Sequence, residues 1–265
     1  IQDVGVRFYT YISTMHYVME ACAENKVVFM VLDRPNPNGF YVDGPVLDPK
    51  FKSFVGVHPI PVVHGMTIGE YAKMINGQKW LKDGVQCKLK VITMENWDHT
   101  KSYDLPVKPS PNLPNAQSIC LYPSICFFEG TAISLARGTL FPFQAIGAPE
   151  LKDQPFSFVP KSIQGMSKNP PNENQTCNGV DLRNYNCDEF KASKKLNLQW
   201  LIEMYKAYPQ KDKFFLPSLF FDKLAGTDQL RKQLIDGKSE TEIRKSWEPA
   251  LSQYKEMRKK YLLYK

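Results

Sequence analysis

Polar side chains that could bind or transform a ligand follow a predicted strand near the start of the chain. Asp33, Arg34 and Asn36 come just after Val27–Leu32, a wholly apolar run rich in β-branched types. Such a run is too short for a lone helix and predicts a strand buried on both faces. In an open α/β sheet, ligands bind at the carboxyl ends of the strands, so this loop is a candidate binding site. Asp33 could instead only cap its own turn, and the sequence leaves both interpretations open.

Further polar candidates stand at the ends of other predicted elements or in loops. They are Gln2, Asp3, Arg7, Tyr9, His64, Asn112, Glu129 and Arg137. Gln2, Asp3 and Arg7 flank a predicted helix terminus, where free backbone N–H groups favour anions. His64 precedes another helix and is either a structural hydrogen-bonding residue or a catalyst. Tyr9 fits either a core position or stacking on a sugar ring.

Glu129 is the candidate with the clearest acid chemistry. It follows the apolar residues 125–128, so burial would raise the pKa of its carboxyl group, as suits a general acid. The alternative is an ion pair with Arg137. We expect all these candidates to line a polar cleft that suits a carbohydrate, and an arginine in that cleft would suit an acidic sugar.

The elements that must position these residues alternate between helix and strand patterns. Apolar residues at helical spacing predict a helix within 6–24, and a capping box of Thr67 and Glu70 predicts a helix over Ile68–Asn76. Further strands are predicted at 59–64 and 88–94. This alternation indicates an α/β fold. Because no strand leads into the first helix, we expect the chain to lack its beginning.

A proline-rich connection, residues 101–117, predicts a rigid link between two domains. We expect residues 1–115 to form the first domain and residues 116–265 the second. The predicted elements of the second are a strand at 156–160, a polar loop over 169–181, a helix from Asn197 to about Tyr208, and two final helices that divide at Pro249, the first with a capping box of Ser239 and Glu242.

Basic residues are concentrated at the end of the chain. Residues 191–265 contain 17 Lys and Arg against 9 Asp and Glu, whereas residues 1–190 contain 17 against 18. The two signs are interspersed at helical spacing, which is typical of a solvated helix face, with polyanion binding as the minor alternative. We therefore expect no nucleic-acid partner. No run of about 18 apolar residues occurs, so no membrane span is expected.

The six cysteines show neither a CxxC motif nor a histidine at zinc-finger spacing. Buried free thiols are therefore expected. In an oxidising compartment, a disulfide between Cys177 and Cys187 is the alternative. The sequence also contains no P-loop and no dinucleotide-binding fingerprint. We expect neither a metal nor a cofactor.

Several runs resemble, in the same order, those of a known bacterial family. They are IQDVGVRFYTYISTM, VLDRPNPNG, PVVHGMTIGEYAKMING, LPVKPSPNLPN, LYPSICFFEGT, ARGT and FPFQAIGAP. The family is that of the NamZ-type exo-β-N-acetylmuramidases, long catalogued as a domain of unknown function, and the resemblance covers nearly the whole chain. It implies a Rossmann-like, doubly wound domain, incomplete at its N-terminus, followed by a smaller α+β domain that completes the cleft.

The resemblance implies a glycosidase that releases N-acetylmuramic acid from the non-reducing end of peptidoglycan fragments, in the periplasm or at the surface of a bacterium. Family members carry a further segment ahead of this chain, with a Phe-Ser-Pro-Glu-His-Gly block whose glutamate is the implied acid. Glycosidases generally use two carboxyl groups, so Asp33 or Glu129 is the candidate for the second, unless the substrate's own N-acetyl group attacks. Arg7, Arg34 or Arg137 is the candidate partner of the lactyl carboxylate. The alternative is a saccharide-binding protein of the same fold without turnover.

Overall fold

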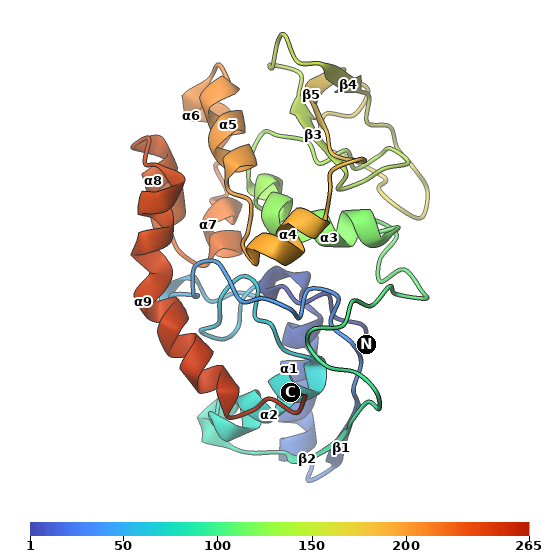
Figure 1. Cartoon of the computed structure of the whole chain (residues 1–265), viewed down its shortest axis with the longest axis vertical. Helices are drawn as coiled ribbons and strands as arrows, with labels where there is room; N and C mark the ends of the chain where they lie inside the picture. Colours follow the sequence, from blue (N-terminus) through green and yellow to red (C-terminus); the bar gives the residue numbers. More distant parts are fainter. Residues whose placement is uncertain (265) are drawn as a thin grey trace. The chain divides into compact units, whose positions relative to one another are not determined.

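The computed structural model describes residues 1–264, which divide into two compact units (Figure 1). The first unit comprises Ile1–Tyr103 together with the chain from Ser246 onward, and the second comprises Asp104–Lys245. The domain limits predicted from the sequence stay a prediction, because compactness alone does not define a folding domain.

The first unit is built on two parallel strands, β1 (Val28–Leu32) and β2 (Lys88–Ile92). They pair in register, with Val28 opposite Lys88 and Leu32 opposite Ile92. This parallel sheet, with a separate antiparallel sheet in the second unit, confirms the expected α/β class.

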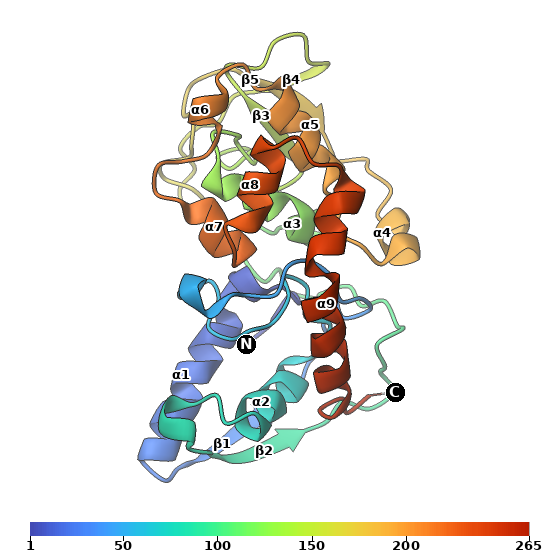
Figure 2. The ribbon, with the colours of Figure 1, turned by 90° about the vertical axis from the view of Figure 1, so that its left-hand side faces the viewer.

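The prediction that β1 is buried on both faces is wrong. Val31 is buried, but Val28, Met30 and Leu32 are 54%, 51% and 68% exposed. The reason is that α1 (Tyr11–Glu24) and α2 (Ile68–Gly77) cover only one face of the strand pair (Figure 2). β1 therefore carries apolar side chains on an exposed face as well as in the core.

Local backbone geometry and capping decide where the helices of the first unit begin. The predicted helix over 6–24 divides into a 3-10 turn, η1 (Arg7–Tyr9), and α1, because Thr10 between them has a left-handed backbone, with φ at 66°. The predicted capping box of Thr67 and Glu70 is confirmed at the start of α2. The strand predicted at 59–64 is wrong, since Val63 there makes only isolated bridges. Two short 3-10 turns complete this part: η2 (Pro49–Phe51) and η3 (Lys82–Gly84).

The long helix α9 (Glu240–Lys259) contains the boundary between the two units. The prediction that it divides at Pro249 is wrong. Proline removes one backbone donor, but buried Trp247, Leu251 and Tyr254 form an apolar stripe that continues past it. Tyr254 joins the core of the first unit, which contains Met15, Met19, Met66 and Met74 among its largest side chains.

The second unit contains an antiparallel sheet in the order β3 (Ala145–Ala148), β5 (Cys177–Asp181), β4 (Phe156–Phe158). The prediction of a strand from 156 is confirmed, but the predicted loop over 169–181 wrongly includes β5. Its sequence, CNGVD, has no apolar alternation, so pairing with β3 and β4 specifies this strand.

Short helices make up the rest of the second unit. They are α3 (Ala116–Ile125), the 3-10 turn η4 (Cys126–Gly130), α4 (Asp188–Ser193), α5 (Gln199–Ala207), α6 (Lys211–Phe214), α7 (Phe220–Ala225) and α8 (Gln229–Ile235). The helix predicted from Asn197 is confirmed as α5, and the Asn197 side chain accepts a hydrogen bond from the backbone of Gln199. A side chain on Gly130 would collide with the backbone of Phe221, so η4 and α7 pack closely because this residue is glycine.

A disulfide joins Cys120 of α3 to Cys187, the residue before α4. The suggested Cys177–Cys187 bridge is therefore wrong, since Cys177 is buried in β5 as a free thiol. Cys22, Cys87 and Cys126 are also free. Within residues 1–264, no helix is both long and apolar enough to cross a membrane.

Candidate functional site

Asp33 anchors the start of α2 and the end of the chain. Its Oδ1 accepts hydrogen bonds from the backbone N–H groups of Gly69, at 2.8 Å, and Arg34, at 3.0 Å. Its Oδ2 accepts from the hydroxyls of Thr67 and Tyr264, both at 2.7 Å. With four donors on its two oxygens, this carboxylate links its own loop, the start of α2 and the segment around Tyr264. Its catalytic role stays a prediction.

Arg34 is oriented by Gln2. The Gln2 side-chain amide donates to the carbonyl oxygens of Asp3, at 2.8 Å, and Pro35, at 3.0 Å, and its Oε1 accepts from Arg34 Nε at 2.6 Å. Both Gln2 and Arg34 are half-buried. This arrangement leaves the outer edge of the guanidinium group, with Nη1 and Nη2, without a carboxylate in the described part of the chain.

Asp3 and His64 form a buried pair beside Gln2. His64 Nδ1 accepts from the backbone N–H of Met66 at 3.2 Å, so the proton belongs on Nε2, which donates to Asp3 Oδ2 at 3.2 Å. The same carboxylate oxygen accepts from the backbone of Gly5. Asp3 Oδ1 is buried without a hydrogen-bond partner among the described residues, which leaves this carboxylate with an open acceptor.

Side chains of α9 fix the backbone at His64. The His64 carbonyl accepts from the Tyr254 hydroxyl at 2.8 Å, and the next carbonyl, of Gly65, accepts from Arg258 Nε at 3.0 Å. Since His64 is fully buried, it is placed to orient Asp3 rather than to touch a ligand directly.

Arg7 and Asn36 are both buried and bind backbone groups. The Arg7 guanidinium donates to the carbonyls of Pro45, at 3.0 Å, and Ile60, at 2.6 Å, and its burial lowers its pKa to about 9. Asn36 donates to the Met66 carbonyl and accepts from the backbone of Asn38. Both residues tie loops of the first unit together.

Tyr9 is half-buried at the end of η1 and packs edge-on against Tyr11, with ring centroids 5.0 Å apart. Burial is the main cause that raises its pKa well above the ordinary tyrosine value, and the charge of Asp3 adds to this shift.

Glu129 and Arg137 meet in the second unit as an ion pair. Arg137 Nη1 donates to Glu129 Oε1 at 2.8 Å, and both side chains are partly exposed, at 23% for Glu129 and 34% for Arg137. Desolvation raises the pKa of the Glu129 carboxyl, while the charge of Arg137 opposes that shift. The buried Cys126 thiol also points at Glu129, with Sγ 3.6 Å from Oε2.

The remaining predicted residue, Asn112, is half-buried and donates weakly to the Met166 carbonyl, at 3.4 Å. The structure thus places Gln2, Asp3, Arg34, Asn36 and His64 close together in the first unit. It brings Glu129 to Arg137 in the second unit. Residues 1–264 contain no group of three or more His, Cys, Asp or Glu side chains that could hold a metal ion.

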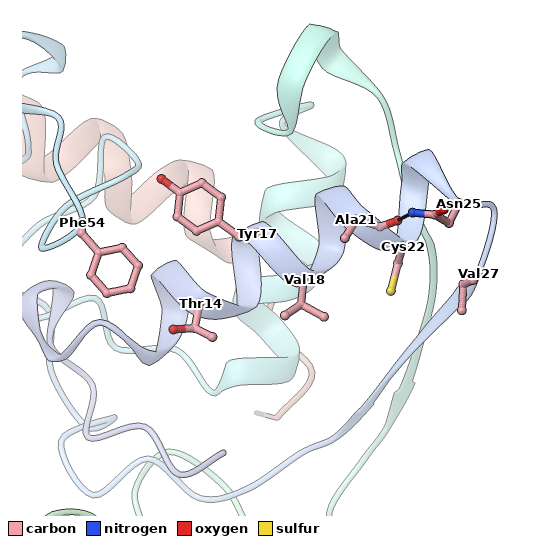
Figure 3. Close-up of a pocket in the computed structure, with 8 residues that line it drawn as sticks. All are labelled: Thr14, Tyr17, Val18, Ala21, Cys22, Asn25, Val27 and Phe54. Atoms are coloured by element: carbon pink, nitrogen blue, oxygen red, sulfur yellow. Dashed lines mark hydrogen bonds between the residues drawn. The ribbon is translucent and has the colours of Figure 1, made fainter.

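A pocket of about 650 Å³ lies elsewhere in the first unit (Figure 3). It is lined by side chains of α1, the turn between α1 and β1, and the loop residue Phe54. They are Thr14, Tyr17, Val18, Ala21, Cys22, Asn25, Val27 and Phe54. None of the predicted site residues is among them, and the lining is mostly apolar. It does not offer the multiple polar contacts that a sugar requires.

Two residues that organise the site were missed from the sequence. Tyr264 reaches Asp33 across 231 positions. Glu70 does more than cap α2, since its Oε1 also accepts from His99 and from the backbone of Leu263. Burial favours a raised pKa for Glu70, but these hydrogen bonds and the interaction with His99 outweigh it and leave the pKa below its ordinary value. No local pattern signals either long-range contact.

Two family models together match almost every residue of the chain. Residues 1–117 match the model described as exo-β-N-acetylmuramidase NamZ, N-terminal, and residues 120–264 match the corresponding C-terminal model. The chain belongs to the NamZ exo-β-N-acetylmuramidase family.

Relatives agree with this assignment over the whole chain. A curated family member, the peptidoglycan β-N-acetylmuramidase NamZ of Bacillus subtilis (strain 168), is 42% identical, and the match covers all of this chain and 66% of that protein. The chain thus spans slightly less than two thirds of the curated relative's length.

Two solved structures from Bacteroides fragilis NCTC 9343 also match, both described as DUF1343 family proteins. The first has a TM-score of 0.96 and 50% identity, covering 100% of this chain and 74% of its own. The second has a TM-score of 0.82 and 27% identity, covering 100% and 73%. This chain therefore has the same fold as both solved structures.

Proposed function

We propose that this chain acts as an exo-β-N-acetylmuramidase that releases N-acetylmuramic acid from the non-reducing end of peptidoglycan fragments. The observation that carries the proposal is the 42% identity, over the entire chain, to a relative named as a peptidoglycan β-N-acetylmuramidase. In the first unit, half-buried Arg34 offers a guanidinium group that suits the carboxylate of an acidic sugar. In the second unit, partly exposed Glu129 offers a carboxyl group.

Glu129 takes one of the two carboxyl roles in this proposal. Hydrolysis of a glycosidic bond uses one carboxyl group to protonate the leaving oxygen, and a second to activate water or to attack the sugar. A raised pKa suits the proton donor, and desolvation shifts the Glu129 pKa in that direction. Its partial exposure leaves a path for a ligand.

The test is release of chromophore from an aryl β-N-acetylmuramide by the unchanged chain, Glu129→Gln and the control Glu203→Gln. Glu203 is an exposed residue of α5 in the same unit, so its replacement matches the chemical change. We expect Glu129→Gln to reduce kcat by about 100-fold or more, the usual scale for a lost acid or base, and Glu203→Gln to leave it unchanged.

Two results would contradict the proposal. Full activity in Glu129→Gln would remove Glu129 from the reaction. Binding of the muramide by the unchanged chain, with no release of chromophore, would favour a non-catalytic saccharide-binding protein of the same fold.

We also propose that the protein works outside the cytoplasm, in the periplasm or at the cell surface, in the recycling of peptidoglycan. The Cys120–Cys187 disulfide supports an oxidising compartment, because structural disulfides persist there and are rare in the cytosol. Fractionation of producing cells tests this location, and recovery of the protein only from the cytosol with both thiols free would contradict it.

A further inference from the structure

Three arginines were candidates for an anionic ligand, and the structure gives each a different environment. Arg7 is buried, and two backbone carbonyls accept from its guanidinium group. Arg137 is already paired with Glu129 at 2.8 Å. Arg34 is half-buried and has no carboxylate partner within residues 1–264. It is therefore the one of these three whose charge is open to a ligand.

Two acidic residues of the same loop cluster, Asp33 and Asp3, direct their carboxylates to groups other than the Arg34 guanidinium. The carboxylate of Asp33, the preceding residue, accepts from the Thr67 and Tyr264 hydroxyls and from the Gly69 backbone. The carboxylate of Asp3 accepts from Gly5 and His64. Neither carboxylate bonds to the Arg34 guanidinium group, although Asp3 Oδ1 has no partner of its own, and among residues 1–264 the edge with Nη1 and Nη2 has no carboxylate partner.

Gln2 holds that edge in one orientation. Its amide nitrogen is fixed by two carbonyls, so its Oε1 presents a rigid acceptor to Arg34 Nε at 2.6 Å. With Nε engaged, the opposite side of the planar group presents Nη1 and Nη2. A guanidinium group held in this way matches the two oxygens of a carboxylate, and fixing it in advance lowers the entropy cost of binding.

The loop beneath Arg34 is itself fixed. Pro35 restricts the backbone just after Arg34, and Asn36 bonds both to the Met66 carbonyl and to the backbone of Asn38. Gly5, at φ of +81°, lies where any side chain would collide with the Asn36 amide. Arg34 therefore extends from a turn whose conformation is fixed by hydrogen bonds and close packing.

We propose that Arg34 binds the carboxylate of an acidic sugar, namely the lactyl carboxylate of N-acetylmuramic acid, and that Gln2 is its positioning residue. The identity of the sugar rests on the function proposed above, whereas the anion site rests on the contacts of Arg34 alone. Arg34 is then the residue that distinguishes N-acetylmuramic acid from N-acetylglucosamine, which lacks the lactyl group.

The test measures binding, separately from the turnover of the aryl muramide described above. Binding of methyl β-N-acetylmuramide, of its lactyl amide and of methyl β-N-acetylglucosaminide is followed by NMR titration. The amide keeps the shape of the lactyl group and removes its charge. The proteins are the unchanged chain, Arg34→Gln, Arg34→Lys, Gln2→Met and Lys88→Gln. Lys88 is an exposed residue of β2, so its variant loses the same charge without touching the site.

We expect the unchanged chain and Lys88→Gln to prefer the acid over its amide by about 10- to 100-fold, the scale of a charge-assisted hydrogen-bonded pair. Arg34→Gln abolishes the preference. Arg34→Lys restores part of it, because the charge returns without the planar fork. Gln2→Met lowers it by about 3- to 10-fold, because the arginine remains but is no longer held in place. Melting temperatures identify any variant that fails to fold.

The outcomes separate this inference from the proposed function. An acid preference that persists in Arg34→Gln, or its absence from the unchanged chain, would overturn the role of Arg34, even if the aryl muramide is hydrolysed. An Arg34-dependent preference without any hydrolysis would support the anion site and refute the glycosidase.

Discussion

The two units of the chain depend on different chemistry for their stability. All four histidines lie in the first unit, and three of them, His16, His58 and His64, are buried. The second unit contains no histidine but carries the Cys120–Cys187 disulfide. The first unit is therefore expected to respond to acid and the second to reduction. This chain thus combines a sensitivity to acid with a sensitivity to reduction, and the two can be tested separately.

Two of the four histidines of the first unit, His16 and His58, form a directed chain of hydrogen bonds. Tyr71 OH lies 2.8 Å from His58 Nδ1, His58 Nε2 lies 3.0 Å from His16 Nδ1, and His16 Nε2 lies 3.2 Å from Glu20. If Tyr71 donates, each histidine is neutral and every donor has an acceptor. The ring of His58 also stacks on Trp80 at 4.7 Å. A histidine chain of this kind is impossible in the second unit, whose sequence contains no histidine.

The largest effect that we predict is loss of the disulfide. It closes a loop with a sequence separation of 67, so removing it should lower the free energy of unfolding of the second unit by about 4 kcal/mol. The variant is Cys120→Ser with Cys187→Ser, and the control is Cys22→Ser, which replaces a free, half-buried cysteine of the first unit. Urea unfolding read by hydrogen exchange of peptides from each unit measures the change.

Two observations would break the comparison at this point. Equal destabilisation of both units by the double variant would show that the disulfide does not act locally. Thiol mapping that finds Cys187 bonded to Cys177 would contradict the pairing itself.

The next effect is a loss of stability of the first unit in acid. Desolvation, with repulsion from His16 and Lys52, lowers the pKa of His58 to about 2 in the folded chain, from 6.5 in the unfolded chain. Below pH 6.5 the unfolded state takes up a proton that the folded state excludes, so the stability present above pH 6.5 falls with pH. The slope is at most about 1.4 kcal/mol per pH unit, or about 2 kcal/mol by pH 5.

The variant that tests this slope is His58→Gln, because glutamine does not titrate. Its Oε1 can accept from Tyr71 and its Nε2 can donate to His16, so the hydrogen-bond chain is kept. We expect its stability to depend less on pH between 6.5 and 5 than that of the unchanged chain. An unaltered slope would assign the acid sensitivity to other groups.

Local signals in the sequence predicted several elements of this fold correctly. The capping box of Thr67 and Glu70 lies within one turn, so its residues alone specify where α2 begins. In contrast, the sequence predicts a loop at β5, because CNGVD has no strand pattern. The segment is a strand because it pairs with β3 and β4. β1 was recognised as a strand, but its apolar run could not show that helices cover only one face.

The sequence was enough to predict which residues belong to the candidate site, but not which contacts each of them makes. The sequence identified Arg34 and Asp33 as polar residues after a strand. It could not show that the Asp33 carboxylate points to Thr67 and Tyr264, because Tyr264 lies 231 positions away. Arg34 is thereby left without a carboxylate partner within residues 1–264. Similarly, the sequence left two interpretations of Glu129 open: a buried acid with a raised pKa, or the partner of Arg137 in an ion pair. The structure combines them, since Arg137 pairs with a carboxyl whose pKa burial raises.

The smallest effect that we predict is confined to one contact of the first unit. The Tyr264 hydroxyl donates to Asp33 Oδ2 at 2.7 Å and accepts from the backbone of Met94 at 3.1 Å. In Tyr264→Phe the Asp33 carboxylate keeps its bonds to Thr67 and Gly69, so we expect a loss of only about 1–2 kcal/mol.

Tyr17→Phe is the control for this change, since Tyr17 is 49% exposed in the same unit. Faster hydrogen exchange should appear in Tyr264→Phe at the start of α2 and around Met94, with the second unit unchanged. Neither a histidine nor a cysteine is altered. The dependence of the unfolding free energy on pH, and its loss on reduction of the disulfide, should therefore stay unchanged. An altered acid slope in Tyr264→Phe would show that the Asp33 cluster and the histidine chain are coupled, and that the acid response is a property of the whole unit.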